Sequence, residues 1–214
     1  MSRFAILLGG DLVRTPRLDA QLGGARVVAA DSGMRHAKTL GLVPELWVGD
    51  FDSEPAVLPE RLAGVPRKRF APEKDRTDGE IAVAEALALG ATSLILVGAF
   101  GGPRADHAFL HLALAIRRAK EGIEVVLTSG NQEGHPVLPG TRGFDFGDGT
   151  LFSLLGFSHL SGVTITGAKW PLESVEVPFG SSLTVSNETR GTLRVTLGVG
   201  RALLLAHPSS GPVA

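Results

Sequence analysis

Residues 46–53 read Leu-Trp-Val-Gly-Asp-Phe-Asp-Ser, a short apolar run followed at once by two carboxylates. The apolar run is typical of a buried strand. Asp50 and Asp52 then stand two residues apart where that strand ends, and in an extended segment such residues point to the same side. Two like charges held so close repel each other unless a cation lies between them, and Mg²⁺ carrying phosphate oxygens is the expected partner. The alternative is an acidic surface turn.

Strand-like and helix-like segments alternate on both sides of this stretch. Apolar runs that end at glycine or polar residues predict strands over 4–8, 26–30, 46–48, 68–71, 93–97 and 123–127. Helices are expected from about 33 to 40, from Thr77 to the glycine at 90, and over 105–121. Thr77 and Glu80 have the spacing of a capping box. This alternation predicts an α/β fold with a mostly parallel sheet and helices on both faces.

The helix expected over residues 105–121 has an apolar stripe that predicts its buried side. The residues of this stripe are Phe109, Leu112, Ala113 and Ile116.

The composition changes after about residue 130, where short strand-like runs separated by turn residues replace the alternation. These runs are 151–155, 162–166, 174–177, 182–185, 192–197 and 201–206, and they predict an antiparallel sandwich or barrel. We therefore expect an α/β domain over 1–130, a connector over 131–149 with one short strand at most, an all-β sandwich over 150–207 and a flexible tail over 208–214.

The composition narrows the class of protein. The chain has 214 residues, 43% of them apolar and 20% charged, and a net charge of −1, so no basic surface for nucleic acid is expected. It has no cysteine, which excludes disulfides, zinc–thiolate sites and a cysteine nucleophile. No signal peptide and no apolar stretch of membrane-spanning length is recognised, so we expect a cytoplasmic protein without a membrane partner.

Candidate site residues follow the expected strands or begin the helices next to them. In parallel sheets, ligands bind at the carboxyl ends of the strands. The fold prediction therefore brings one set of side chains to a single sheet edge: Asp31, Asp50, Asp52, Asp78, Arg104 and Asp106. Asp75 and Asp78 form a second acidic cluster, although helix capping alone would also explain Asp78.

Two further motifs carry polar or aromatic side chains suited to binding. Gly101-Gly102-Pro103-Arg104-Ala105-Asp106-His107 joins a strand to a helix, where glycine N–H groups and Arg104 suit a phosphate. It matches neither the Walker nor the dinucleotide glycine pattern, and simple turn chemistry is the alternative. Trp170 is either a core residue or a stacking surface for a flat or cationic ligand. Ser186 and Asn187 offer polar contacts or form a simple turn.

Together these motifs resemble the thiamine pyrophosphokinase family. The matching elements, in the order of the family, are Ala30-Asp31-Ser32-Gly33, Gly49-Asp50-Phe51-Asp52-Ser53, Lys74-Asp75-Arg76-Thr77-Asp78, Arg104-Ala105-Asp106-His107, residues 162–172 and Val185-Ser186-Asn187. The resemblance implies an α/β nucleotide-binding domain, a C-terminal β-sandwich, and a homodimer with active sites between subunits. Trp170 of one chain would then stack on the thiamine that the other chain holds.

The resemblance also implies a reaction, in which the thiamine hydroxyl attacks the β-phosphorus of ATP and AMP leaves. Asp50, Asp52 and Asp78 would hold Mg²⁺, with Asp75 as a further candidate ligand, and Arg104 would stabilise the transferring group. Asp78 or Asp52 would accept the hydroxyl proton. The residues expected around ATP are Asp31, Gly33, Asp75, Thr77, Gly101, Gly102, Asp106 and His107, and those expected around thiamine are Trp170, Ser186 and Asn187.

Two other functions stay open from the residues alone. One is a phosphatase in which an aspartate of Asp50-Phe51-Asp52 is the nucleophile, which would form a covalent phosphoenzyme. The other is a sensor that binds nucleotide and thiamine without catalysis. The number of carboxylates argues against an anion sensor that lacks a metal.

Overall fold

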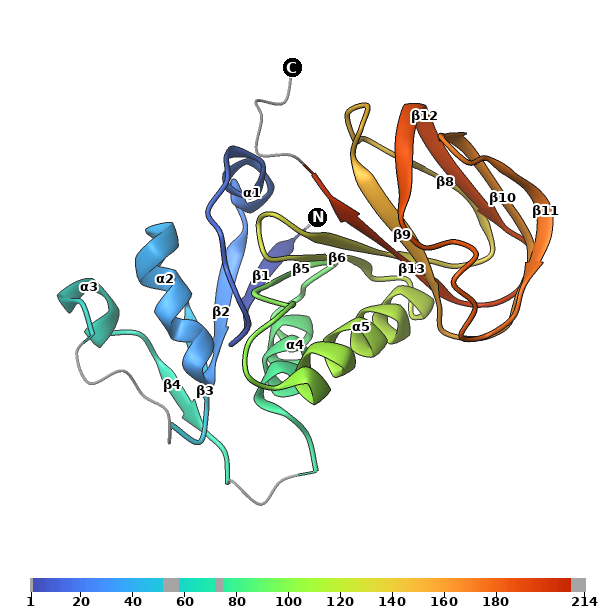
Figure 1. Ribbon diagram of the computed structural model, residues 1–214. Helices are drawn as coiled ribbons and strands as arrows, with labels where there is room; N and C mark the ends of the chain where they lie inside the picture. The colour runs from blue at the N-terminus through green and yellow to red at the C-terminus, as the bar shows by residue number, and fades with distance from the viewer. Residues whose placement is uncertain (1, 52–57, 72–74, 209–214) are drawn as a thin grey trace.

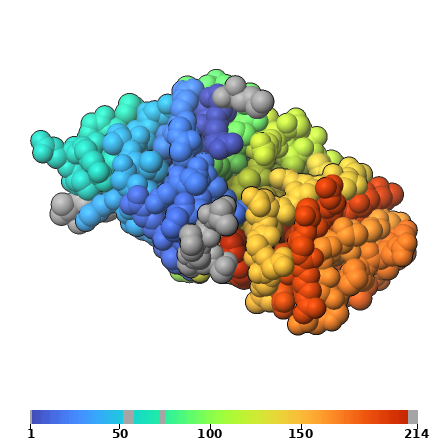
Figure 2. Space-filling view, turned by 90° about the horizontal axis from the view of Figure 1, so that it is seen from above, coloured from blue at the N-terminus to red at the C-terminus, as the bar shows by residue number. Residues whose placement is uncertain are grey.

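A computed structural model describes residues 2–51, 58–71 and 75–208 of the chain. Figure 1 shows an α/β half, blue to green, beside a strand-rich half, yellow to red, and the space-filling view in Figure 2 shows the same two halves side by side. The strands of the first half are β1 (Arg3–Leu7), β2 (Arg26–Ala30), β3 (Leu46–Gly49), β4 (Arg67–Arg69), β5 (Ser93–Val97) and β6 (Glu124–Thr128). Their order is β6-β5-β1-β2-β3-β4, and every neighbouring pair in it is parallel. The predicted parallel sheet is confirmed.

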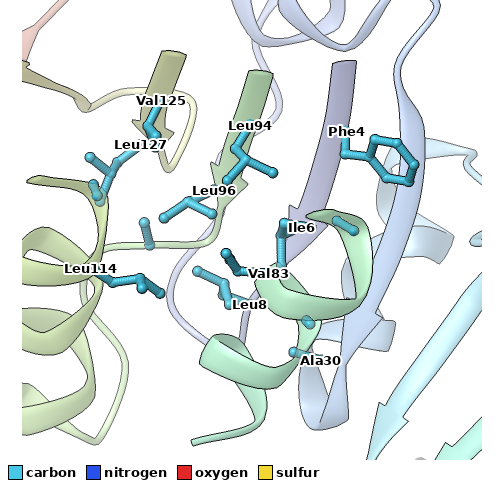
Figure 3. Close-up of a cluster of buried hydrophobic side chains, with 14 of the residues drawn as sticks. Phe4, Ile6, Leu8, Ala30, Val83, Leu94, Leu96, Leu114, Val125 and Leu127 are labelled. Carbon is cyan, nitrogen blue, oxygen red and sulfur yellow. The ribbon is translucent and has the colours of Figure 1, made fainter. Parts of the chain in front are cut away.

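Helices cover both faces of this sheet because alternate strand residues point to opposite sides. The helices are α1 (Pro16–Leu22), α2 (Met34–Leu40), α3 (Glu60–Ala63), α4 (Asp78–Ala88) and α5 (Ala105–Lys120). Phe4 and Ile6 of β1 pack with α4 and α5 in one apolar core, part of which Figure 3 shows. Ala5 and Leu7 of the same strand face α1, α2 and α3 in a second core.

The start of α4 is as predicted, whereas the buried face of α5 is predicted only in part. The Thr77 hydroxyl accepts a hydrogen bond from the Glu80 N–H at 3.2 Å, as a helix cap should. On α5, Phe109 is 59% exposed, and its ring stacks on Phe157 of the strand-rich half with centroids 5.9 Å apart. The buried residues are His111, Leu114, Ala115 and Ile116, so Ile116 is confirmed, and Leu112 packs partly buried against the first core.

The short helix α1 was missing from the sequence prediction, although its start carries a recognisable signal. The Thr15 hydroxyl accepts a hydrogen bond from the Leu18 N–H at 3.2 Å, and Pro16 occupies the first helical position. Thr15 also donates to the carbonyl of Gly130, so the start of this helix is attached to the turn after β6.

The second half is antiparallel, as predicted. Its strands are β7 (Glu133–Val137), β8 (Gly140–Phe144), β9 (Leu151–Gly156), β10 (Leu160–Ala168), β11 (Leu172–Val177), β12 (Asn187–Leu197) and β13 (Ala202–His207). One layer continues the α/β sheet through β7, β13 and β9, and the other contains β8, β12, β10 and β11. The start of β12 pairs with β9 and so connects the two layers. A third apolar core contains side chains from both sheets, and the sandwich is confirmed.

Two expectations for this half are wrong. Residues 131–149 are not a connector with one strand at most, because they contain β7 and β8. The predicted strand over 182–185 is a turn, held to β9 by hydrogen bonds between Thr184 and Leu154. The expected boundaries between domains remain predictions. In the expected tail, residues 209–214 lie outside the described residues.

A buried carboxylate explains why β7 does not read as a strand in the sequence. Glu133 is 1% exposed, and its carboxylate accepts hydrogen bonds from Arg17 and Gln21 of α1. His135 Nε2 lies 3.3 Å from the same carboxylate. Burial alone would raise the pKa of Glu133, but the hydrogen bonds from His135 and Arg17 bring that pKa below its ordinary value. The network therefore joins α1 to the second half of the molecule.

Replacing Glu133 with alanine should destabilise the fold by about 3 kcal/mol, because Arg17 is left partly buried without its counter-charge. The free energy of unfolding from urea titration measures this. The matched control is Asp19→Ala. Asp19 lies on α1, as Arg17 does, and its carboxylate forms an exposed ion pair with Arg14, so its removal should cost less than about 1 kcal/mol.

The effect of Glu133→Ala should also depend on pH. Since the folded-state pKa of Glu133 is lowered, the stabilisation is fully present above the ordinary value of 4.5 and is lost as the pH falls through the folded-state pKa. Equal costs for the two substitutions at pH 7 would contradict the assigned role of Glu133.

Candidate active site

A cavity of about 420 Å³ lies where β1, β2 and β5 end, and segments distant in sequence line it. The sequence-predicted residues that the structure brings together there are Asp31, Asp78, Gly101, Gly102, Arg104 and His107. They come from the turn after β2, the start of α4 and the loop between β5 and α5. This is the sheet edge at which a parallel fold binds its ligands.

The cavity depends on close backbone contacts that only glycine permits. A Cβ at Gly33 would lie 2.1 Å from the carbonyl oxygen of Leu7, so the turn after β2 rests directly on the end of β1. Gly101 has a φ of +67°, and a Cβ there would lie 2.0 Å from Oδ2 of Asp11. The first contact joins two backbone segments, and the second places the backbone at Gly101 directly against the Asp11 carboxylate.

The predicted acidic residues are only partly gathered in this cavity. Asp31 and Asp78 line it, whereas Asp50 does not. A Cβ at Gly49 would lie 3.2 Å from Oδ1 of Asp31, so the end of β3, which carries Asp50, is next to the Asp31 carboxylate. Asp52 lies outside the described residues. Among the residues that are described, no three His, Cys, Asp or Glu side chains form a cluster that could hold a metal.

Asp75 and Thr77 have surroundings that differ from those of Asp78. The Asp75 side chain is 96% exposed and lies 3.8 Å from the Arg76 guanidinium, so it faces solvent rather than the cavity. Thr77 caps α4 and lines a second cavity of about 150 Å³ between α4 and α5.

Arg104 forms a two-pronged ion pair with Asp106. Its Nε and Nη2 donate to the two carboxylate oxygens at 3.0 and 2.6 Å. The hydrogen bond from Arg104 holds the pKa of Asp106 well below its usual range, and the same bond raises the pKa of Arg104. Both side chains are more than half exposed, so the ion pair itself adds little stability. A phosphate could replace the carboxylate with the same geometry.

Three residues at this site were missing from the sequence prediction. Arg35 Nη2 donates to the carbonyls of Gly9 and Gly10, and His36 Nε2 lies 3.0 Å from the Gly10 carbonyl oxygen. Burial lowers the pKa of His36. His111 is buried and lines the cavity. The sequence signal for Arg35 and His36 is the glycine pair Gly9-Gly10 after the first strand, since both side chains contact carbonyls of that pair.

The predicted thiamine residues lie outside this cavity, in the strand-rich half. Trp170 is in the turn between β10 and β11, and its side chain is 55% exposed, so the core alternative is wrong. The Asn187 amide accepts from the Trp170 N–H at 3.1 Å and donates to its carbonyl at 2.8 Å. Asn187 therefore fixes the turn that presents the indole. Ser186 is exposed and has a φ of +61°.

Comparison with known proteins identifies the family. The thiamin pyrophosphokinase catalytic domain matches residues 24–127, and the thiamin pyrophosphokinase vitamin B1 binding domain matches residues 143–203. The chain belongs to the thiamine pyrophosphokinase family. The two matched domains correspond to the α/β half, with its cavity, and to the strand-rich half, with Trp170.

Individual relatives agree with this assignment. The thiamine pyrophosphokinase of Bacillus subtilis is 28% identical over 179 residues, which are 80% of this chain and 83% of that protein. A crystal structure from Bacillus subtilis superposes with a TM-score of 0.82 at 24% identity, covering 97% of this chain and all of that one. The crystal structure of thiamin pyrophosphokinase from Geobacillus thermodenitrificans superposes with a TM-score of 0.76 at 26% identity, and the superposition covers all of both chains. These relatives favour the kinase over the phosphatase and sensor hypotheses.

No helix among the described residues is long and apolar enough to span a membrane.

Replacing Gly33 with alanine should cost about 2 kcal/mol or more in the free energy of unfolding, because the added methyl collides with the Leu7 carbonyl oxygen. Urea titration measures the loss. The control is Gly64→Ala, where an added Cβ meets nothing within 4 Å, and its expected change is within about 0.5 kcal/mol. Full stability of the Gly33 variant would show that the contact is easily relieved.

Proposed function

We propose that this chain transfers the pyrophosphoryl group of ATP to the hydroxyl of thiamine and releases AMP. The observation that carries the proposal is the cavity at the ends of β1, β2 and β5, where Asp31, Asp78 and Arg104 converge in a chain that contains both domains of the family. ATP and thiamine are the expected substrates, and the cytoplasm is the expected compartment.

ATP would bind along the glycine-lined wall of the cavity. The residues proposed to surround it are Asp31, Gly33, Asp75, Thr77, Gly101, Gly102, Asp106 and His107. Gly101 and Gly102 leave backbone accessible beside the start of α5, which suits a phosphate. Arg104 would exchange Asp106 for a phosphate oxygen pair, since both partners are solvent-accessible. Asp75 would need to turn from solvent to take part.

Asp50, Asp52 and Asp78 would hold Mg²⁺, which would supply positive charge against the phosphate oxygens. The donor set fits this ion, because carboxylate oxygens are hard ligands and Mg²⁺ in phosphate sites needs only one or two of them. The contact between Gly49 and the Asp31 carboxylate supports a site at the ends of β2 and β3. Asp52 lies outside the described residues, so the lack of a three-group cluster among those residues does not test this set of ligands.

The chemistry is a direct in-line displacement. A bond forms between the thiamine hydroxyl oxygen and the β-phosphorus of ATP, while the bond from that phosphorus to the bridging oxygen of AMP breaks. The hydroxyl proton passes to a carboxylate, either Asp78 or Asp52. The Arg104 guanidinium stabilises charge on the transferring group. No phosphoenzyme is formed.

Replacing Asp50 with asparagine should lower kcat/KM for AMP production by about 100-fold, because a neutral amide replaces a charged oxygen ligand. AMP is measured with thiamine, ATP and Mg²⁺ present. The control Asp145→Asn changes an exposed aspartate after β8 and should leave the rate unaltered. Activity of the Asp50 variant close to wild type would remove Asp50 from the metal role.

Thiamine would bind between two copies of the chain. Trp170 lies outside the nucleotide cavity of its own chain, and more than half of its side chain is exposed. Phe179, Leu183 and Val185, in the segment between β11 and β12, are also exposed. A homodimer would cover such apolar side chains and bring the indole to the partner's cavity, where its ring face suits the thiazolium cation.

Mixing two inactive variants tests whether sites are shared between subunits. Asp50→Asn and Trp170→Ala should each be nearly inactive alone, at thiamine concentrations below KM. After exchange of subunits, half of the dimers carry one site with both native residues, and about one quarter of wild-type activity should return. No recovery, with dimers confirmed by analytical ultracentrifugation, would place both residues in one chain's site. A monomer in that measurement would contradict the dimer directly.

A further inference from the structure

The proposed mechanism leaves His111 without a role, although it lines the cavity. His111 is buried on α5, and its Nδ1 lies 3.1 Å from the carbonyl oxygen of Ala99. A carbonyl oxygen only accepts hydrogen bonds, so Nδ1 must carry the proton. The imidazole is thereby fixed in both orientation and tautomer.

The ring is neutral near pH 7, which makes its other nitrogen an acceptor. Burial lowers the pKa of His111, the hydrogen bond to Ala99 opposes this, and the charge of His107 one turn away lowers it further. Nε2 therefore presents a lone pair. Within the part of the chain that the structure describes, no hydrogen-bond donor reaches this nitrogen.

Nε2 lies beside residues that line the main cavity. A Cβ at Gly79 would lie 3.4 Å from Nε2, and Gly79 lines the main cavity from the first turn of α4. His111 also lines the smaller cavity of about 150 Å³, together with Leu110, Ala113 and Leu114. The imidazole thus separates the main cavity from a side pocket with partly apolar walls.

The chemistry of this acceptor differs from that of its neighbours in the main cavity. The other polar side chains there include the carboxylates of Asp31 and Asp78 and the guanidinium groups of Arg35 and Arg104, whose charges suit phosphates and a cation. A neutral acceptor instead suits a neutral O–H or N–H donor. ATP carries such donors on its ribose and on the exocyclic amine of adenine.

We propose that His111 Nε2 accepts a hydrogen bond from a neutral donor of the bound nucleotide, and that this contact selects nucleotides that carry the donor. The inference rests on the proposed function, since it takes ATP as the occupant of the cavity. A nucleotide that lacks the donor would leave the buried Nε2 without a hydrogen bond, and this costs binding free energy. Such a nucleotide should therefore bind more weakly than ATP.

The test compares four nucleotides by isothermal calorimetry without thiamine: ATP, 2′-deoxy-ATP, 3′-deoxy-ATP and purine riboside triphosphate, each with Mg²⁺. The wild-type chain should bind ATP about 3- to 10-fold more tightly than one of the three analogues. Loss of affinity for a deoxy analogue identifies a ribose hydroxyl, and loss for purine riboside triphosphate identifies the adenine amine. In His111→Leu the same ratio should fall to about 1.

Two further variants keep the result interpretable. His111→Gln retains a carbonyl acceptor and should keep part of the ratio. His159→Leu alters an exposed histidine paired with Glu176, outside the cavity, and should leave every ratio unchanged. Because each ratio compares ligands on one protein sample, a smaller folded fraction does not affect it.

Two results would overturn the inference: a wild-type chain that binds all four nucleotides equally or not at all, and a His111→Leu variant that keeps the wild-type ratio. Failure of the proposed function gives a different result. A chain that shows the expected binding ratios but releases no AMP with thiamine would support the nucleotide contact and contradict the kinase reaction.

Discussion

Backbone segments meet at the carboxyl end of β1 with no room for side chains between them. A Cβ at Gly33 would collide with the Leu7 carbonyl, and one at Gly10 would lie 2.4 Å from the carbonyl oxygens of both Gly98 and Phe100. These contacts bring the turn after β2 and the loop after β5 against the same strand end. The backbone positions of Asp31, in the turn after β2, and of Gly101 and Gly102, in the loop after β5, follow from this packing, so at these residues the constraint is steric before it is electrostatic.

The same strand end is connected to the rest of the molecule through α1. Val13 donates to the Ser129 carbonyl, Thr15 donates to Gly130, and Arg17 pairs with Glu133 in β7. Ser129 in turn accepts from the Phe100 N–H through its hydroxyl. The glycine loop of the cavity and the first strand of the sandwich extension are therefore held by one short segment. Both halves share a sheet, and this segment adds a second connection between them.

The parallel sheet, the cap of α4 and the sandwich could be predicted because apolar period and turn residues determine them locally. The strand β7 could not, because Glu133 and His135 are buried through partners on α1 that no local pattern reveals. His111 of α5 is likewise buried with a partner outside its own helix, the carbonyl oxygen of Ala99, and the predicted apolar stripe does not include it. The sequence predicts Asp31, Asp78 and Arg104 at one edge from their places just after the expected strands or at the start of a neighbouring helix, whereas the solvent-facing Asp75 and the amide contacts of Asn187 required side-chain geometry.

The charges around the cavity favour a nucleotide that arrives with a cation. The described lining residues include two carboxylates, Asp31 and Asp78, and two guanidinium groups, Arg35 and Arg104, so they offer no net positive charge. Asp106 already occupies two donors of Arg104. A polyphosphate that enters without a cation would displace the Asp106 carboxylate from Arg104. It would then lie near the carboxylates of Asp31 and Asp78, at distances where like charges repel strongly. Bound with Mg²⁺, it would meet the same carboxylates as ligands. Acidic residues at a phosphate site are thus consistent with catalysis on a metal–nucleotide complex and unfavourable for binding the free nucleotide.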